Sequence, residues 1–253
     1  MGRLAGAIGT GDPYLSQSRA LNYLELHDEV WPESGGQRLV VTIDPTFPHD
    51  SVFASGRTTL AQGVVLLSPG IPAIHQGTEW LEDTAFGANA PGTYDARIDW
   101  AKKQQYADVF RYYRDLIHVR KTNGALRANA GCHVYHVNEL GNVLAFQRWD
   151  NDGNVIVVVA NFSNTTYGSY KLGLPLPGTW YPLINSQAAG YGGEGQGPCG
   201  PLTTVDVSNW DGQAQSAWFT LPRMSLLVLR HDHAPDEWLD GDGDAWPDVC
   251  DNC

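Results

Sequence analysis

A histidine and two carboxylates come directly after a short apolar segment near the start of the chain. Residues 21–26 predict a β-strand, and His27, Asp28 and Glu29 lie at its carboxyl end. Cleavage of a glycosidic bond passes through an oxocarbenium-like transition state, which carboxylates stabilise, and an imidazole is suited to hold sugar hydroxyls. Taken alone, a His-Asp pair favours an exposed loop over a catalytic site, and its surroundings decide between the two interpretations.

A second group of polar and aromatic residues follows another apolar segment. Residues 71–75 predict a short buried strand, and Gln76, Glu79 and Trp80 come soon after it. Gln76 and Glu79 are candidates to line a sugar cleft, with loop packing as the alternative. Trp80 is a candidate to stack on a sugar ring, with a place in the core as the alternative.

Two strand-helix units carry these residues and predict an α/β architecture. Helices are expected over 57–68 and 104–121, and in the second the apolar side chains recur at steps of three and four. A closed (β/α)8 barrel needs about 250 residues. Two units therefore correspond to only the last quarter of such a barrel.

From about residue 131 the pattern changes to short strands separated by Gly, Asn, Asp and Pro turns. This spacing predicts an antiparallel β-sandwich, so the expected fold class is α/β followed by all-β. The predicted strands are 133–137, 142–149, 155–161, 168–172, 179–185, 216–221 and 225–230. The glycine-rich stretch 190–200 is expected to be a long surface loop.

The end of the chain is acidic. Aspartates occupy relative positions 1, 3, 5, 9 and 12 of one segment, a spacing of oxygen ligands that Ca²⁺ uses; they are Asp240, Asp242, Asp244, Asp248 and Asp251. The alternative is a solvated acidic tail. Cys250 and Cys253 form a CxxC that suits a disulfide-bearing secreted repeat or a metal site, and the pairing of the four cysteines stays open.

Charge and hydropathy exclude several classes of partner. The net charge is −12, and residues 231–253 hold eight acids and no Lys or Arg, which leaves 20 acids against 16 bases elsewhere. A nucleic acid partner is not expected, because its binding needs clustered basic residues. Neither a signal peptide nor an apolar run long enough to span a bilayer is found in the sequence, although a signal is expected to lie upstream.

Four segments, taken in order, resemble one enzyme family. Residues 22–29, Asn-Tyr-Leu-Glu-Leu-His-Asp-Glu, resemble the fourth conserved region of glycoside hydrolase family 13, the α-amylase family. Residues 68–80, which include Gly-Ile-Pro and Gln-Gly-Thr-Glu, resemble its eighth-strand motif. Residues 97–100 and 112–127 resemble its last barrel helix and the exit from it. The resemblance implies strands 7 and 8 of a (β/α)8 TIM barrel, followed by the family's all-β C-terminal domain.

The resemblance also implies roles for the candidate residues. Asp28 corresponds to the carboxylate that stabilises the transition state, and His27 to the imidazole that binds sugar hydroxyls in the same subsite. The family's nucleophilic Asp and acid-base Glu lie on the fourth and fifth strands, which are expected to be missing from this chain. No other carboxylate, including Glu25, lies in a motif that would replace them. The isolated chain is therefore expected to be inactive without the N-terminal barrel half.

Three regions are expected from these patterns. Residues 1–128 form the C-terminal part of the barrel, residues 129–231 the all-β domain, and residues 232–253 an acidic Ca²⁺-binding segment. The last segment resembles the start of a thrombospondin type 3 repeat. Such repeats lie outside the cytoplasm, so the resemblance implies a secreted protein with Ca²⁺ and no organic cofactor.

The expected partner is an α-glucan polysaccharide such as starch or glycogen. The resemblance implies action on α-1,4-glucosidic bonds with retention, by a hydrolase or a branching transferase. The continuation His27-Asp28-Glu29 favours the branching enzymes. The alternative is a non-catalytic carbohydrate-binding or adhesion fragment with a calcium-binding repeat. A reading frame that extends upstream of Met1 through strands carrying the nucleophile and the acid would favour the enzyme.

Overall fold

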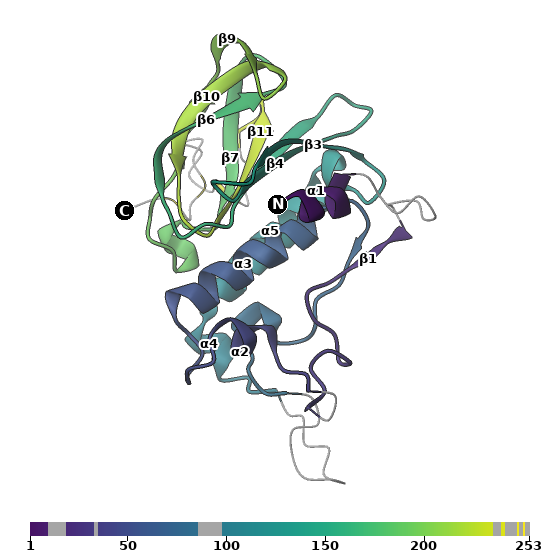
Figure 1. Cartoon of the computed structure of the whole chain (residues 1–253), viewed down its shortest axis with the longest axis vertical. Coiled ribbons are helices and arrows are strands. Elements are labelled where there is room, and N and C mark those ends of the chain that lie inside the picture. The colour runs from purple at the N-terminus through teal and green to yellow at the C-terminus, as the bar shows by residue number, and fades with distance from the viewer. Residues whose placement is uncertain are drawn as a thin grey trace.

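The structure is a computed structural model. It describes residues 1–9, 19–32, 35–85, 98–234, 239–240, 247 and 250, with only the backbone of residues 9 and 205–208. A helical part comes first along the chain and a strand-rich part follows it (Figure 1). The expected order, α/β followed by all-β, is confirmed.

Two antiparallel sheets make up the strand-rich part. The larger sheet has six strands in the order β3-β4-β5-β11-β7-β8, and the smaller has three in the order β6-β10-β9. The strands are β3 (Gly131–Asn138), β4 (Val143–Trp149), β5 (Val155–Asn161), β6 (Tyr167–Leu174), β7 (Thr179–Asn185), β8 (Leu202–Thr203), β9 (Val205–Trp210), β10 (Gln213–Leu221) and β11 (Ser225–His231).

The central strand β5 shows why this part is stable. Its side chains alternate between the two faces of the sheet and are buried on both. Val157 and Val159 pack against the smaller sheet, whereas Ile156 and Val158 face the helices. The strand therefore contributes to two hydrophobic cores, one between the sheets and one between the larger sheet and the helices.

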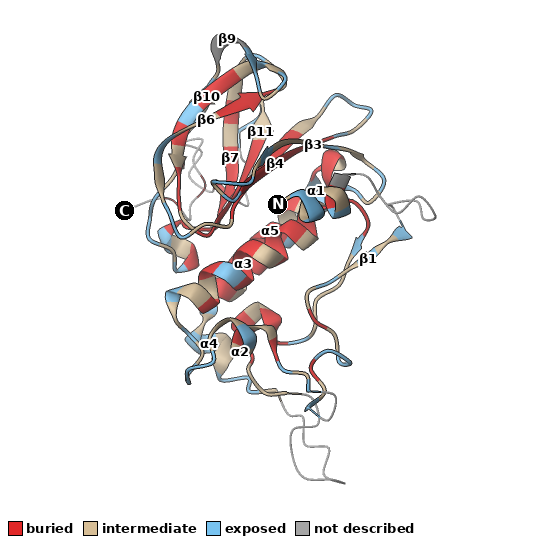
Figure 2. Cartoon of the chain, viewed as in Figure 1, coloured by how far each residue is buried: buried red, intermediate tan, exposed pale blue. Residues whose placement is uncertain are grey.

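Two long helices cover the second face of the larger sheet (Figure 1). In α3 (Val52–Leu67) the side chain of Ser51 caps the first turn by accepting a hydrogen bond from the Ala54 amide at 3.3 Å. This cap explains why the helix begins five residues before the predicted start at residue 57. In α5 (Ala107–Thr122) the buried side chains recur at the predicted steps of three and four. Figure 2 shows buried residues along α3 and in the strands next to it.

The remaining elements are short. They are α1 (Gly2–Gly9), α2 (Leu39–Ile43), α4 (Lys102–Gln105) and the 3-10 turns Thr78–Trp80, Gly124–Leu126 and Ala189–Tyr191. The helix predicted over 104–121 is split at Tyr106, whose φ and ψ of −113° and 45° are not helical. Among the described residues no helix is both long and apolar enough to cross a membrane.

The two strands expected in the helical part are much shorter than predicted. β1 (Leu21–Asn22) and β2 (Ile71–Pro72) form a two-stranded parallel sheet, where strands 21–26 and 71–75 were expected. Leu21 and Ile71 are 53% and 51% exposed, so the prediction of a buried strand at 71–75 is wrong for this chain. Neither strand has a second neighbour among the described residues, and a two-stranded sheet gains little from burial.

Two strands of the β-rich part were not predicted. β8 and β9 lie in the stretch 202–210, whose apolar residues alternate with polar ones and are not continuous. Asp211 and Gly212 join β9 to β10 with φ angles of 55° and 72°. An Asp-Gly pair with two positive φ angles is a preferred two-residue hairpin turn, and it was the sequence signal for β9.

Candidate active site

Parallel pairing of β1 and β2 brings the two candidate segments to the same edge. Leu21 pairs with Ile71 and Asn22 with Pro72, and the Ala73 amide donates to the Asn22 carbonyl at 2.8 Å. Because parallel strands end at the same side of a sheet, residues 23–29 and 73–80 leave it together. Their side chains define the candidate site.

His27 and Asp28 lie at the surface of this edge. Their side chains are 63% and 85% exposed, and His27 Nε2 lies 3.2 Å from Asp28 Oδ1. The carboxylate is therefore accessible to a ligand, and the imidazole is held beside it. This is the arrangement needed for one charged group and one hydrogen-bonding group to meet the same sugar ring.

Glu29 shapes the loop that carries this pair. Its carboxylate accepts a hydrogen bond from the Leu26 amide at 3.0 Å and another from the Tyr23 hydroxyl at 3.2 Å. The hydrogen bond to Glu29 raises the pKa of Tyr23. Glu29 was predicted to bind substrate, and these contacts give it a role in holding the loop.

Below the surface lies a buried ion pair. Glu25 is 4% exposed and accepts hydrogen bonds from the Leu39 amide at 2.5 Å and the Thr78 hydroxyl at 2.7 Å. Arg38 Nη2 lies 3.4 Å from Glu25 Oε1, and the same guanidinium donates to the carbonyls of Gln76 and Glu82 at 3.0 Å each. Burial lowers the pKa of Arg38. This network ties the two candidate segments together.

Gln76 and Glu79 are placed differently from each other. The side chain of Gln76 is exposed at the edge, while its backbone carbonyl accepts from Arg38. Glu79 is half-buried and accepts from the Gly77 amide at 2.9 Å, and burial raises its pKa. Gly77 has a φ of 97°, which favours glycine at this turn.

Trp80 is a core residue in this structure. It is 2% exposed, and its ring centroid lies 5.0 Å from that of Trp100 and 6.2 Å from that of Phe110. These contacts support the packing alternative for Trp80 rather than sugar stacking. Of the predicted residues, the exposed ones are His27, Asp28, Glu29 and Gln76, and Glu79 is half-buried.

Two residues of the site were not among the predicted ones. His75 is half-buried; burial lowers its pKa, Arg38 and His27 lower it further, and Glu25 and Glu29 oppose them. Its position directly after the apolar segment 71–74 was a usable signal. Arg38 had none, because nothing near it in the sequence marks it as the partner of Glu25.

The predicted calcium ligands fall mostly outside the described residues. Asp242, Asp244, Asp248 and Asp251 are not described, and Asp240 is 7% exposed. Within the described ranges no group of three or more His, Cys, Asp or Glu side chains is arranged to hold a metal ion.

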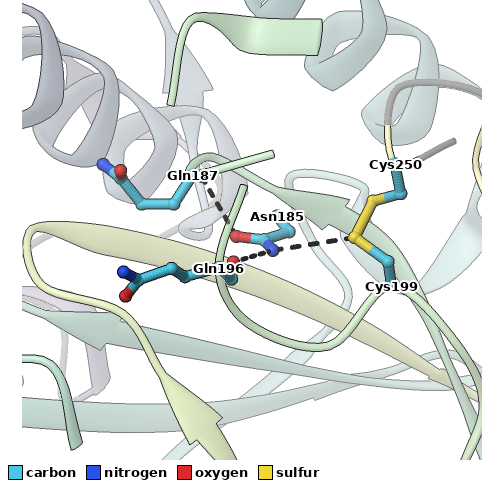
Figure 3. The surroundings of a disulfide bond; sticks show 5 residues. All are labelled: Asn185, Gln187, Gln196, Cys199 and Cys250. Atoms are coloured by element: carbon cyan, nitrogen blue, oxygen red, sulfur yellow. Dashed lines mark hydrogen bonds between the residues drawn. A yellow bond between two sulfur atoms is a disulfide. The ribbon is translucent and has the colours of Figure 1, made fainter. Parts of the chain in front are cut away.

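One disulfide connects the end of the chain to the β-rich part. Cys199 and Cys250 are bonded, with Cα atoms 5.6 Å apart (Figure 3). Cys132 is a free thiol. The amide of Asn185 donates to the Gln196 carbonyl at 2.7 Å and lies 3.9 Å from the Cys199 sulfur, which holds this loop in place. Cys250 therefore bonds outside its CxxC, and Cys253 lies beyond the described residues.

Comparison with known proteins places both parts of the chain. Residues 134–232 match the α-amylase C-terminal all-beta domain. A 1,4-alpha-glucan branching enzyme from Mycobacterium sp. (strain KMS) is 32% identical over 63% of this chain and 21% of its own length. The branching enzyme of Nocardia farcinica is 28% identical over 80% of the chain and 26% of its length.

A solved structure shares the fold over nearly the whole chain. The pullulanase of Anoxybacillus sp. LM18-11 superposes with a TM-score of 0.62 at 23% identity, over 91% of this chain and 30% of the pullulanase. The chain thus spans about a quarter of the branching enzymes and under a third of the pullulanase. The matched domain and the related branching enzymes agree with the motifs of residues 22–29 and 68–80: the chain is similar to the α-amylase family, glycoside hydrolase family 13.

Proposed function

We propose that this chain is part of an enzyme that acts on α-1,4-linked glucan with retention, and that Asp28 stabilises its transition state. The observation that carries the proposal is the exposed His27–Asp28 pair at the edge shared by β1 and β2. The branching enzymes among the relatives support a glucan as the substrate.

The chemistry assigned to this edge is electrostatic. The carboxylate of Asp28 faces the positive charge that develops on the sugar ring, and its exposure of 85% makes it accessible to the ligand. His27 donates to a ring hydroxyl, and Gln76 contacts the same ligand from the neighbouring loop. Glu29 and the buried Glu25–Arg38 pair keep the two loops in register.

We further propose that the chain alone does not turn over substrate. The family's nucleophile and acid-base residue belong to two other strands. The carboxylates of Glu25 and Glu82, which lie nearby, are 4% and 1% exposed and are occupied by backbone amides. Neither is available to attack or protonate a glycosidic bond.

Incubation of the purified chain with amylose tests whether the chain alone turns over substrate. We expect no release of reducing ends and no shift in the iodine absorption of amylose, whereas an active branching enzyme run in parallel produces that shift. Turnover by the purified chain at an ordinary enzymatic rate of about 1 s⁻¹ or faster would contradict the proposal.

The role of Asp28 is tested in a hybrid in which this chain replaces the matched segment of a related branching enzyme. We expect Asp28→Asn to lower kcat on amylose by about 10²–10³-fold, because an oriented charge that acts on the transition state is lost. Asp152→Asn changes an exposed carboxylate in the β4–β5 hairpin and serves as the control. Equal activities of the two variants would remove Asp28 from the mechanism.

Between hydrolysis and transfer we propose branching transfer. The relatives matched over most of the chain are branching enzymes, and His27 continues into Asp28 and Glu29 as in that subfamily. To test this, the product that the hybrid protein makes from amylose is debranched, and its chain lengths are measured. New short chains released by debranching are expected; linear maltooligosaccharides alone would indicate a hydrolase.

For the acidic segment 232–253 we propose Ca²⁺ binding in an exported, thrombospondin type 3-like module. The aspartate spacing and the Cys199–Cys250 disulfide support it, because disulfides persist in oxidising compartments. Calorimetry of the whole chain should record heat with millimolar Ca²⁺, and Asp242→Asn with Asp244→Asn should abolish it. Equal heats from the variant and the wild type would refute the assignment.

A further inference from the structure

The outer face of the smaller sheet carries two exposed indole rings. Trp218 of β10 is 55% exposed and Trp210 of β9 is 42% exposed. The opposite face of the same sheet, through Ala217, Phe219 and Leu221, is buried against the larger sheet. The two tryptophans therefore do not contribute to the core between the sheets.

A lysine organises the two rings. Lys171 of β6 is the register partner of Trp218, and its Nζ lies 4.2 Å from the Trp210 ring centroid and 5.6 Å from that of Trp218. The two centroids are therefore less than about 10 Å apart. The Trp210 indole N–H donates to the Lys171 carbonyl at 3.1 Å, which fixes the orientation of that ring. Trp210, Lys171 and Trp218 form what we call the indole platform.

The size of the platform argues against a protein partner. A fully buried indole covers about 150–250 Å², so two half-exposed rings offer on the order of 200 Å². A stable protein interface needs about 800 Å² on each partner. A ligand with a small apolar face and polar edges fits better.

A pyranose ring has that shape. Its axial C–H groups form an apolar face that packs on an aromatic ring, and its hydroxyls accept hydrogen bonds from an ammonium group. The fixed rings and the lysine between them also reduce the entropy lost on binding. A neutral sugar carries no cation that would compete with the Lys171 ammonium for the faces of the indole rings.

We propose that the indole platform is a non-catalytic binding site for a neutral α-glucan chain, with Trp218 as the stacking ring, Lys171 as the hydrogen-bond donor and Trp210 as a fixed side wall. The choice of an α-glucan rests on the proposed function. In Figure 1 the sheet that carries the platform lies at the top of the view, whereas β1 lies at the right near mid-height. The platform holds a polymer at a place where no bond is cleaved.

Affinity electrophoresis of the whole chain tests the platform. Native gels are cast with amylose, with glycogen, with the β-linked glucan laminarin or with no polysaccharide. We expect amylose and glycogen to retard the wild-type chain, and Trp218→Ala to weaken the apparent affinity about tenfold, as for tryptophans at the centre of a binding site. Trp210→Ala should weaken it less, because that ring already carries Lys171 on one face.

Trp149→Ala is the matched control. Trp149 is 39% exposed and lines a different surface groove beside Asp150 and Arg127. The control should migrate as the wild type in every gel, and thermal melting checks that each variant folds. An equal loss of retardation in Trp149→Ala and Trp218→Ala would overturn the assignment to the platform.

Three other results would also overturn the proposal. Retardation by laminarin but not by amylose would refute the ligand, and the absence of retardation by any polysaccharide would refute the site. A wild-type dimer that Trp218→Ala converts to a monomer would make the face an interface between copies. None of these results depends on catalysis, so failure of the platform is distinguishable from failure of the proposed enzyme activity.

Discussion

The helical part, residues 19–126, and the strand-rich part, residues 131–231, use their strands in opposite ways. In the strand-rich part β5 has a partner on each edge and a hydrophobic core on each face. In the helical part β1 and β2 pair with each other, and their apolar residues Leu21 and Ile71 are about half exposed. Figure 2 shows the contrast between β1 and the buried strands of the larger sheet.

The difference shows that a strand is defined by its neighbours as much as by its own residues. The apolar segments 21–26 and 71–75 were predicted as strands but keep only two paired residues each. The helices α3 and α5 of the same part are well buried, because the larger sheet supplies the surface that they cover. The candidate active site therefore sits on the least supported sheet of the described chain.

The largest expected effect on stability comes from truncating a buried leucine of the strand-rich part, and an exposed leucine of the helical part is its comparison. Leu227 of β11 is fully buried between the two sheets, and Leu227→Ala should lower the free energy of unfolding by about 2–5 kcal/mol. Leu21→Ala should change it by less than about 0.5 kcal/mol, because that side chain is already exposed. Urea unfolding measures both. Similar losses would mean that β1 is as well packed as β11.

The strand bounds of the strand-rich part were predicted from the sequence more accurately than those of the helical part. The predicted bounds of 155–161 and 179–185 are confirmed without change, because those strands carry nearly continuous apolar runs and gain neighbours on both edges. The ends of β1 and β2 were not predictable, since the length of a strand depends on its neighbours and neither strand has a second one in the described part of the chain. The His27–Asp28 pair was predictable from local order, but the Glu25–Arg38 pair, formed by residues 13 apart in separate loops, was not.

The next largest effect concerns the disulfide that fastens residue 250 to the strand-rich part. Loss of a cross-link between positions 51 residues apart should cost about 2–4 kcal/mol, so Cys250→Ser should melt earlier than the wild type. Cys199→Ser and the double variant should match it, since each removes the same bond. A peptide map that joins Cys250 to Cys253 would contradict this pairing.

Cys132 provides an internal control for that experiment. Burial raises the pKa of its thiol to about 11, so it remains protonated at pH 8 and alkylates slowly while the protein is folded. Rapid alkylation of Cys132, located by peptide mapping, should therefore begin only on unfolding. Labelling of Cys132 in the folded wild type would mean that the thiol is more accessible than its burial indicates.

A smaller effect is expected where the two parts touch. A Cβ on Gly63 of α3 would lie 2.5 Å from the Tyr112 hydroxyl and 2.9 Å from a Leu226 methyl group. Tyr112 is held by a 3.0 Å hydrogen bond to the Thr59 carbonyl and cannot easily move. Gly63→Ala should therefore cost about 1–2 kcal/mol after the gain of about 1 kcal/mol in helix propensity.

Gly56 of the same helix gives a matched comparison of opposite sign. Its added Cβ would meet the Met224 and Gln187 side chains at 3.4 and 3.5 Å, which is ordinary contact. Gly56→Ala should stabilise the protein by about 0.5–1 kcal/mol through helix propensity alone. If thermal melting shows both variants shifted in the same direction, α3 does not pack on the larger sheet as closely as described.

The smallest effect is a pH dependence at the candidate site. The pKa of His75 is lowered from 6.5 by burial and by Arg38, so the unfolded chain binds the proton more tightly than the folded chain. Stability from this group is complete above about pH 6.5 and is lost as the pH falls toward the folded pKa. Because the ring is only half-buried, solvent limits the change to less than about 1 kcal/mol.

His75→Gln should flatten the decrease in melting temperature between pH 7 and 5. Gln76→Ala, a change at the exposed neighbouring residue, should leave that decrease as in the wild type. Equal slopes for the wild type and His75→Gln would mean that the edge of β1 and β2 is solvated throughout, which would extend the contrast with the strand-rich part to the site itself.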